Sequence, residues 1–417
     1  MFGDRHLIVV DLGFGDAGKG ATVDWLCSPR AGLDVAAVVR FNGGAQAAHN
    51  VVADGRHHTF RQFGSGTLSE VPTLLSRHML VEPLALAAEA RELAALGVAD
   101  PLSLLYVDER ALLTTPIHGA ANRCREDTRG TARHGSCGIG IGETASYALD
   151  HDAPRVADCA RPDVLRRKLI ALEEHYAPLL AGGRHRYDPI ADLVAAYTAF
   201  AEVVAILPGE QLAGFAHSGR LVFEGAQGVL LDEWRGTHPY TTWSTVEPRN
   251  ARDMLARIGA PGYVLGVTRA YMTRHGAGPF PTEDPALSIP EPHNGTGVYQ
   301  GAFRRGHLDP LLLRYAIDAC GGIDGLAVNH LDAVGDIRTA TGYLTADGCV
   351  DRLDCGVWQD LDHQQGLSDL LSAATPALTD LPGDVPGYLE AELGAPVVLT
   401  AHGPDRADRT VRITAQA

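Results

Sequence analysis

The sequence predicts an α/β fold with a mainly parallel central sheet and flanking helices. Short apolar segments with the length and β-branched content of buried strands recur along the chain. Helix-like segments rich in Ala, Leu and Glu stand between them, and strands that alternate with helices imply crossover connections and parallel pairing. Glycine-rich loops follow the first two strand-like segments, where open α/β sheets bind their ligands.

The expected elements follow one another in a regular order. Strands are predicted at residues 6–10, 35–40, 102–106, 220–223, 263–267, 325–328 and 396–399. Helices are predicted at residues 19–27, 83–96, 162–174, 191–204 and 311–319. Residues 281–292 contain Pro, Glu and Asp without apolar periodicity, so we expect an exposed mobile loop there. Because no repeat or long linker interrupts the series, we expect one continuous domain over residues 1–417.

The chain is acidic, with 51 acidic residues against 35 basic ones and a formal net charge of −16. Such a charge repels nucleic-acid phosphates and anionic membrane surfaces, so we expect neither partner. Small phosphorylated ligands stay possible, because backbone amides and one or two cations can hold them. No apolar stretch approaches the length of a membrane-spanning helix, and the N-terminus does not resemble a signal peptide. A cytoplasmic location is therefore expected.

The first glycine-rich loop carries a pattern suited to binding phosphate. Its candidate residues are Gly13, Gly15, Asp16, Gly18, Lys19 and Gly20. Glycines let the backbone approach an anion, and the lysine adds positive charge at a helix N-terminus. The spacing matches G-x-x-x-x-G-K, but glycine replaces the usual Ser or Thr after Lys19. Alone, such a loop is compatible with a structural turn. Asp16 favours function, because a carboxylate beside phosphates is costly unless it holds a cation or takes a proton.

The second strand-like segment leads into the sequence RFNGGAQAAHN, which ends in His49 and Asn50. A lone histidine in an apolar stretch is more often a hydrogen-bonded core residue than a catalytic one. Its position after a glycine-rich strand exit leaves both interpretations of His49 open.

Six ordered segments resemble the adenylosuccinate synthetase family and span nearly the whole chain. They are GDAGKG, GGAQAAHN, FEGAQGVLLDEWRGTHPYTT, GVTRAYMTRHGAGPFPTE, NHLD and HGPDR. The resemblance implies a P-loop-NTPase-like, adenylosuccinate-synthetase-like fold. It also implies a GTP- and Mg²⁺-dependent ligase that phosphorylates a ring oxo group, such as that of IMP, and displaces the phosphate with an amine such as aspartate. Members of this family act as homodimers, so a homodimer is expected here.

Carried over to matching positions, the resemblance implies definite roles. Asp16 would be the general base and a Mg²⁺ ligand, with the carbonyl of Ala48 as the second protein ligand. His49 would stabilise the transferring phosphoryl group, and Gln227 would orient the ring and its oxygen. Asp332 would accept hydrogen bonds from the N1–H and 2-amino groups of guanine, which explains a preference for GTP. The expected GTP-binding residues are Gly15, Gly18, Lys19, Gly20, Asp332, Gly403 and Pro404.

The departures from the family pattern gather on the acceptor and amine-donor sides. The residues expected to bind the acceptor are Gln46, Ser136, Cys137, Thr242 and His275. Among them, Gln46 replaces an asparagine, Cys137 a threonine and His275 a valine. The expected donor loop contains Val298, Tyr299, Gly301 and Arg304. There two threonines and an arginine of the family have become Val298, Tyr299 and Gly301, and the arginine that reaches a neighbouring subunit is His151.

This pattern leaves three functions open. One is a specialised paralogue with a changed acceptor, a changed donor or both. Another is a divergent enzyme that still joins aspartate to IMP. The third, from a different class, is a GTP-binding protein or phosphotransferase that has lost ligation. Gln227 argues against the third function, because a residue that orients a ring oxygen has no evident use in a pure GTPase.

Overall fold

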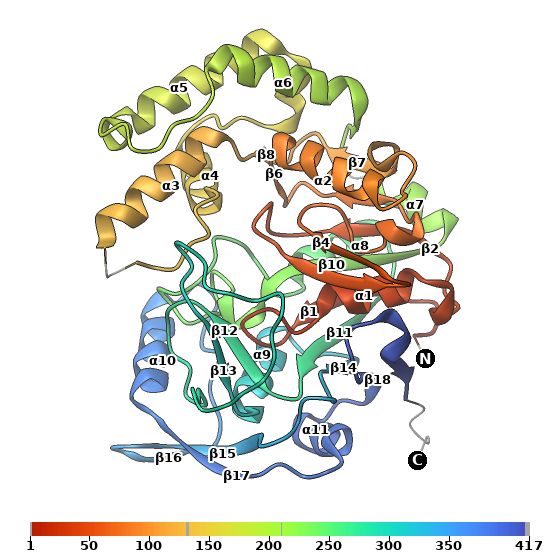
Figure 1. Cartoon of the computed structure of the whole chain (residues 1–417), viewed down its shortest axis with the longest axis vertical. Coiled ribbons are helices and arrows are strands. Elements are labelled where there is room, and N and C mark those ends of the chain that lie inside the picture. The colour runs from red at the N-terminus through yellow and green to blue at the C-terminus, as the bar shows by residue number, and fades with distance from the viewer. Residues whose placement is uncertain (1, 131–132, 210, 413–417) are drawn as a thin grey trace.

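The structure is a computed structural model that describes residues 2–130, 133–209 and 211–412. Its centre is a ten-stranded sheet with the order β19-β18-β14-β11-β1-β10-β2-β5-β7-β9 (Figure 1). Neighbouring strands pair in parallel except β18 and β19, which are antiparallel. The predicted α/β fold with a mainly parallel sheet is therefore confirmed.

The middle of the sheet is formed by the most apolar strands. All six residues of β1 (His6–Asp11) are buried, because β10 (Arg220–Gly228) and β11 (Gly262–Arg269) flank it and helices cover both faces. The other strands are β2 (Val35–Arg40), β5 (Thr73–Leu75), β7 (Leu105–Asp108), β9 (Ala205–Leu207), β14 (Gly325–Asn329), β18 (Val397–Ala401) and β19 (Arg409–Val411).

Alternate side chains of β1 enter two different cores. Leu7 and Val9 pack with residues of α1 (Lys19–Cys27) on one face of the sheet. Ile8 and Val10 pack on the other face with residues of α8 (Arg249–Arg257) and α9 (Pro310–Ala319). The loop between β1 and α1 therefore emerges from the best-packed part of the molecule.

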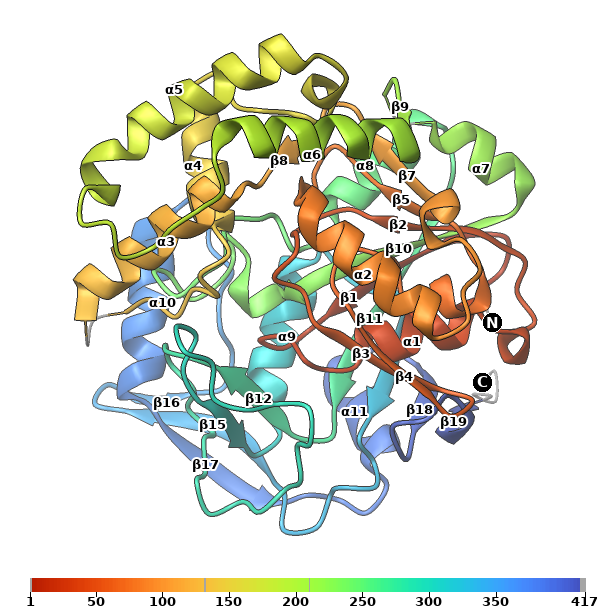
Figure 2. The ribbon, with the colours of Figure 1, turned by 45° about the horizontal axis from the view of Figure 1, so that its top comes forward.

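Helices and small sheets extend the central sheet at both ends (Figures 1 and 2). One end carries α2 (Pro83–Ala95), α3 (Pro116–Arg129), α4 (Ile141–Asp150), α5 (Pro162–Leu180), α6 (Ile190–Val203) and α7 (Leu212–Ser218). The opposite end carries β15 (Arg338–Thr345), β16 (Gly348–Val350), β17 (Thr375–Asp380), α10 (Leu361–Ala373) and α11 (Val385–Leu393). Short two-stranded ladders are formed by β3 (His49–Ala53) with β4 (Arg56–Phe60), β6 (Leu80–Val81) with β8 (Leu112–Leu113), and β12 (Met272–His275) with β13 (Phe303–Gly306).

Two local predictions hold only in part. The strand expected at 102–106 is a 3₁₀ turn (Pro101–Leu104) followed by β7, because Pro101 opens a helical turn rather than a strand. Residues 281–292 are not exposed throughout, since the Glu291 side chain is buried in an ion pair with Arg269. Among the described helices, none is long and apolar enough to cross a membrane.

Candidate active site

The loop between β1 and α1 is held from below by a buried carboxylate. Asp11, the last residue of β1, accepts hydrogen bonds from the amides of Gly13 at 2.8 Å and Ala17 at 2.9 Å. It also forms a 3.0 Å ion pair with the Nζ atom of Lys19. Both side chains are buried, so the lysine charge is neutralised beneath the loop instead of facing an open cavity. Asp11 thus sets the curvature of the loop.

Close packing explains the glycine that follows Lys19. A Cβ atom at position 20 would lie 2.5 Å from the Cβ of His49 and 3.0 Å from the Oγ of Ser65. Gly20 therefore lets the β3–β4 hairpin lie against the start of α1 (Figure 2). The Ser or Thr of ordinary phosphate loops is excluded here because the histidine occupies its space.

Asp16 stands at the tip of the loop in a strained conformation. Its φ angle of 60° lies in the left-handed region, which is rare for residues other than glycine. The Nε of Arg269, at the end of β11, donates to its backbone carbonyl at 2.5 Å. Burial raises the pKa of Asp16, and the charges of Arg269 and Lys19 act in the opposite direction. A carboxyl with a raised pKa in a strained loop is typical of functional sites.

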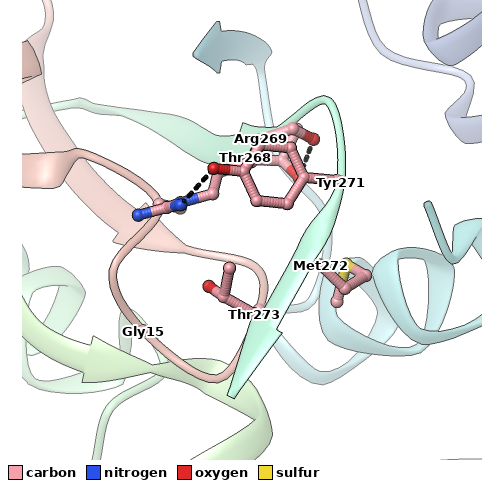
Figure 3. Close-up of a pocket in the computed structure, with 8 residues that line it drawn as sticks. Gly15, Thr268, Arg269, Tyr271, Met272 and Thr273 are labelled. Carbon is pink, nitrogen blue, oxygen red and sulfur yellow. Dashed lines mark hydrogen bonds between the residues drawn. The ribbon is translucent and has the colours of Figure 1, made fainter. Parts of the chain in front are cut away.

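Figure 3 shows the pocket between this loop and the strands β11 and β12. Its lining residues are Gly13, Gly15, Ala17, Thr268, Arg269, Tyr271, Met272 and Thr273. The Arg269 guanidinium donates to the Tyr271 hydroxyl at 2.9 Å, and both side chains bond the carboxylate of Glu291. Glu291 therefore ties the loop between β12 and β13 directly to the residue that holds Asp16.

His49 belongs to a buried dyad with Glu224 of β10. The Nδ1 atom of His49 lies 2.7 Å from Oε1 of Glu224, which also accepts from the Ser65 hydroxyl at 2.5 Å, while Oε2 accepts from the Ser65 amide at 2.9 Å. Burial acts to raise the pKa of Glu224, but His49, Arg40 and Ser65 lower it to about 2. Burial lowers the pKa of His49. A neutral imidazole therefore donates from Nδ1 to an ionised carboxylate, which leaves its Nε2 available.

Two glutamine amides border the same region without protein partners. Both polar atoms of the Gln46 side chain, and Oε1 of Gln227, are buried and unbonded within the described ranges. A Cβ at Gly44 would lie 3.2 Å from Oε1 of Gln46, and one at Gly43 would lie 3.3 Å from Oε1 of Gln227. Gln227 also has a left-handed φ of 60°. Buried polar atoms are nearly always satisfied, so these unbonded amide atoms are candidates for contact with a ligand.

Two of the predicted acceptor residues lie within electrostatic reach of Asp16. Cys137 is exposed at the surface, yet protein surrounds its thiol closely enough that desolvation, with the Asp16 carboxylate as the second cause, raises its pKa to about 11, so Cys137 is a neutral thiol. His275 lowers the pKa of Asp16, and its Nε2 lies 3.2 Å from the carbonyl oxygen of Gly301. Ser136 is hydrogen-bonded to the Asn122 side chain at 3.0 Å.

Thr242 lies further along the chain on the loop after β10, where its amide donates to the carbonyl of Leu231 at 2.8 Å. Ala48 directly precedes His49 and is exposed. His151, expected to replace a residue that reaches across subunits, stacks on Tyr147 at a ring distance of 4.3 Å. Its Nδ1 lies 3.1 Å from the Tyr147 carbonyl oxygen, so this ring caps α4.

The predicted donor loop is a tight turn. The amides and carbonyls of Gly297 and Gly301 exchange hydrogen bonds at 2.9 and 3.0 Å, so the residues between them form its tip. Val298 is 82% exposed there. A Cβ at Gly138 would lie 2.9 Å from the ring of Tyr299, so the turn packs closely against the loop that contains Cys137.

The predicted guanine-binding residues come from two adjacent strands. Asp332 is exposed just after β14, while Gly403 and Pro404 follow β18, and these two strands pair in parallel. The amide of Leu331 donates to the carbonyl of Ala401 at 3.0 Å, which fixes the two loops side by side.

Sequence reasoning missed residues that position the others. Asp11, Glu224 and Asn329 were given no role, although the side-chain amide of Asn329 donates from Nδ2 to the carbonyl of Ala17 at 2.6 Å and supports the loop. Each is a polar residue in or at the end of an apolar strand. A buried polar group in such a strand needs a partner, and that was the available signal.

Metal ligation by the protein is sparse. Within the ranges that the structure describes, no group of three or more His, Cys, Asp or Glu side chains could hold a metal ion. Mg²⁺ usually keeps several waters and takes only one or two carboxylates together with substrate phosphates. Asp16, at the tip of the phosphate-type loop, fits that requirement.

Comparison with known proteins decides the family. The adenylosuccinate synthetase family model matches residues 8–410. The chain belongs to the adenylosuccinate synthetase family. It is 32% identical to the adenylosuccinate synthetase of Neisseria gonorrhoeae (strain ATCC 700825 / FA 1090), over 98% of each chain. That of Neisseria meningitidis serogroup B is also 32% identical, again over 98% of each chain.

Solved structures agree on the fold. Fully ligated adenylosuccinate synthetase from Plasmodium falciparum has a TM-score of 0.79 and 21% identity, covering 98% of this chain and 100% of that one. A cyanophage S-2L succinoaminodeoxyadenylate synthetase, bound to dGMP and dATP, has a TM-score of 0.61 and 16% identity, covering 99% and 96%. This member of the adenylosuccinate synthetase family is a GTP- and Mg²⁺-dependent ligase that forms a carbon–nitrogen bond, as the sequence predicted. Its substrates are small molecules, a nucleotide and an amine.

Proposed function

We propose that this ligase phosphorylates the ring oxygen of a 6-oxopurine nucleotide, IMP or a close analogue, and replaces it with an amine. The observation that supports this acceptor is the pair of unbonded amides of Gln46 and Gln227. The lactam edge of a 6-oxopurine offers a carbonyl oxygen, to which a side-chain amide can donate, and one N–H group, which is left to a carboxylate base. A ligand of this kind would remove the cost of leaving three buried polar atoms unsatisfied.

Asp16 is proposed as the base that takes the N1 proton of the ring. Burial raises its pKa towards the pH at which it works, which favours proton transfer. The hydrogen bond from Arg269 holds the Asp16 backbone from behind, so the carboxylate stays at the tip of the loop. As the proton leaves, negative charge moves to the ring oxygen, which becomes the nucleophile.

His49 is proposed to stabilise the charge that develops on the transferring phosphoryl group. Its Nδ1–H is anchored on ionised Glu224, so the imidazole can take a proton on Nε2 and donate it to an anion, and the carboxylate stabilises the imidazolium. Preorganised donors of this kind account for much of the catalysis of phosphoryl transfer.

GTP is proposed to bind along the loop after β1, with backbone amides near Gly15, Gly18, Lys19 and Gly20 facing its phosphates. The guanine would lie between Asp332 and the turn of Gly403 and Pro404, since those loops are adjacent. Mg²⁺, when bound, neutralises phosphate charge, and the Asp16 carboxylate and the Ala48 carbonyl would be its protein ligands. We further propose that the enzyme is a cytoplasmic homodimer, as its family resemblance implies.

Positional isotope exchange tests the proposed function without requiring the amine. GTP labelled with ¹⁸O in the β–γ bridge is incubated with the enzyme, Mg²⁺ and single 6-oxopurine nucleotides. Reversible phosphoryl transfer to the ring oxygen moves the label into non-bridge positions, and we expect this only when an acceptor is present. Asp16→Asn should abolish the exchange. GTP hydrolysis that needs no acceptor, with no exchange in any mixture, would instead support the GTPase alternative.

A further inference from the structure

Glu291 is a charged residue in an exposed stretch of the loop between β12 and β13. Its neighbours Pro292 and His293 are exposed, but the Glu291 side chain is only 4% exposed. Prolines stand on both sides of it, at positions 290 and 292. Each proline fixes its own φ angle and restricts the residue before it to extended backbone. The chain is therefore stiff where it directs this carboxylate into the protein.

Three side chains donate to the Glu291 carboxylate. The Arg269 guanidinium and the Tyr271 hydroxyl, at 2.6 Å, share Oε1, and the Asn294 side-chain amide donates to Oε2 at 3.0 Å. Burial acts to raise the pKa of Glu291, but these three partners lower it below its ordinary value. Glu291 is therefore an ionised carboxylate whose bonds are directed to groups of the protein.

Arg269 connects this carboxylate to the base proposed for the reaction. From Nη1 it donates to Glu291 and to the Tyr271 hydroxyl at 2.9 Å (Figure 3), and from Nε it donates to the backbone carbonyl of Asp16 at 2.5 Å. A guanidinium is planar, and its N–H groups point in fixed directions relative to one another. The direction of the bond to Asp16 therefore depends on where Glu291 holds the other edge of the same group.

The conformation of Asp16 depends on such support. Its left-handed φ of 60° is strained for an aspartate, and strained residues persist only where surrounding contacts impose their conformation. The bond from Arg269 is made to the carbonyl of Asp16 itself, beside the pocket that Arg269 lines together with Gly15 and Tyr271. A shift of Arg269 would release this carbonyl and let the Asp16 side chain turn away from the tip of the loop.

The same loop also contacts the hairpin that carries His49. The ring of His293 stacks on that of His57 in β4 at a centroid distance of 4.4 Å. The Nε2 atom of His57 lies 3.2 Å from Oδ1 of Asn50, the residue that follows His49. The segment at 291–293 therefore braces the elements that carry both proposed catalytic side chains.

We propose that Glu291 is a positioning residue of this ligase, which orients Arg269 and through it places the Asp16 carboxylate for proton abstraction. This inference rests on the proposed function and adds a residue to it. The turn between Gly297 and Gly301, where the donor is expected, belongs to the same loop. Docking of that loop therefore places the base and the donor side together, so the ring oxygen is activated only when the loop is docked.

Hydrogen exchange tests the positioning without substrates. In the full-length protein, Glu291→Gln should raise the exchange rates of the backbone amides at residues 12–20 by about 10-fold or more, as measured by mass spectrometry. Asp158→Asn is the matched control and should leave residues 12–20 unchanged. Asp158 is also a buried carboxylate with ion pairs, at 2.8 Å to Arg161 and 3.0 Å to Lys168, but it lies beside α5 and α6. Equal protection of residues 12–20 in wild type and Glu291→Gln would overturn the proposal.

Isotope exchange measures the consequence for the reaction, with GTP, Mg²⁺ and an acceptor that is active with the wild type. Glu291→Gln should lower the acceptor-dependent exchange rate by about 10–100-fold and change the KM for GTP by less than about three-fold, because a displaced base slows the step without removing a nucleotide contact. Glu291→Asp, which keeps the charge, should recover part of the rate. A wild-type exchange rate in Glu291→Gln, with only thermal stability lowered, would show a purely structural role and overturn the proposal.

Arg269→Lys, alone and combined with Glu291→Gln, tests whether the effect passes through Arg269. Lysine keeps the charge but cannot bond Asp16 and Glu291 from one planar group, so it should lower the exchange rate by a similar factor. The double variant should lose no more activity than Arg269→Lys does. Multiplied losses would overturn the proposal, because Glu291 would then act by another route. Absence of isotope exchange with every acceptor in the wild type would count against the proposed function, and the amide protection of residues 12–20 would still decide the role of Glu291.

Discussion

Replacement of Glu224 by glutamine separates the structural and the catalytic contributions of one buried carboxylate. The pKa of Glu224 is lowered from 4.5 to about 2, so its ionised form stabilises the folded state, by an amount on the order of 1–3 kcal/mol for hydrogen bonds to a charged group. Because the folded-state pKa is lower than the unfolded value, this contribution is present above pH 4.5 and is lost as the pH falls through 2. Glu224→Gln should therefore cost on the order of 1–3 kcal/mol at pH 7, and less at pH 3.

The same substitution should slow catalysis. Loss of the charged partner of His49 removes a charge-assisted hydrogen bond worth about 1.5–3 kcal/mol, which corresponds to a decrease of roughly 10–150-fold in kcat. Urea unfolding at several pH values measures the first effect. Steady-state GDP release measures the second, and the KM for GTP should change little, because the dyad acts on the transferring group.

Glu89→Gln is a matched control. Glu89 is also fully buried, accepts from the amides of Arg61 at 2.7 Å and Gln62 at 2.9 Å, and lies 3.8 Å from His58. Its replacement should lower stability by about 1–3 kcal/mol and leave kcat within about two-fold. If Glu224→Gln lowered stability as Glu89→Gln does but kept wild-type kcat, the catalytic role of the His49 dyad would be refuted.

Four further predictions concern the nucleotide side of the site. Asp16→Asn should eliminate GDP release, and the wild-type rate should fall as the pH drops through a pKa above 3.8, because only the ionised carboxylate is a base; a flat profile from pH 4 to 8 would contradict this. Gly20→Ser, which restores the common phosphate-loop residue, should cost about 1–3 kcal/mol in thermal unfolding by forcing His49 away, and unchanged stability and kcat would show that the space is not needed. Removal of Mg²⁺ with EDTA should stop GDP release reversibly without changing the midpoint of thermal unfolding, because no described metal cluster supports the fold. Asp332→Asn should raise the KM for GTP by about 10-fold or more and should raise the KM for ITP, which lacks the 2-amino group, by less. Equal changes in the two KM values would show that Asp332 does not bind the 2-amino group of guanine.

The fold could be predicted from local sequence because the apolar composition of the central strands shows that they are buried. The central residues of β1 and β11 form continuous apolar runs, as strands covered on both faces do. The segment at 102–106 failed because apolar content alone does not separate a 3₁₀ turn from a strand when a proline precedes it. The loop at 281–292 departs from the expectation where Glu291 forms a buried ion pair with Arg269, because that pair joins residues on separate elements.

Some residues of the candidate site could likewise be predicted from the sequence, and others could not. Asp16, His49 and Gln227 could be found because they stand in short motifs directly after strands. Their supports could not, because Glu224 meets His49 only where β10 pairs with β2 and the hairpin of β3 folds over α1. The same limit applies to Arg304 and Arg305, because the sequence cannot show that Arg304 forms an ion pair with Glu283.

The sequence by itself determined the order of strands and helices, the phosphate-type loop and the family of this protein, because these depend on periodicity and on neighbours within a few residues. Only the tertiary structure decided that Lys19 forms an ion pair with Asp11, that Gly20 makes room for His49, and that Arg304 forms an ion pair with Glu283. These facts depend on contacts between distant segments, and a side chain's partner is fixed by where the packed sheet brings other charges, which no local pattern contains.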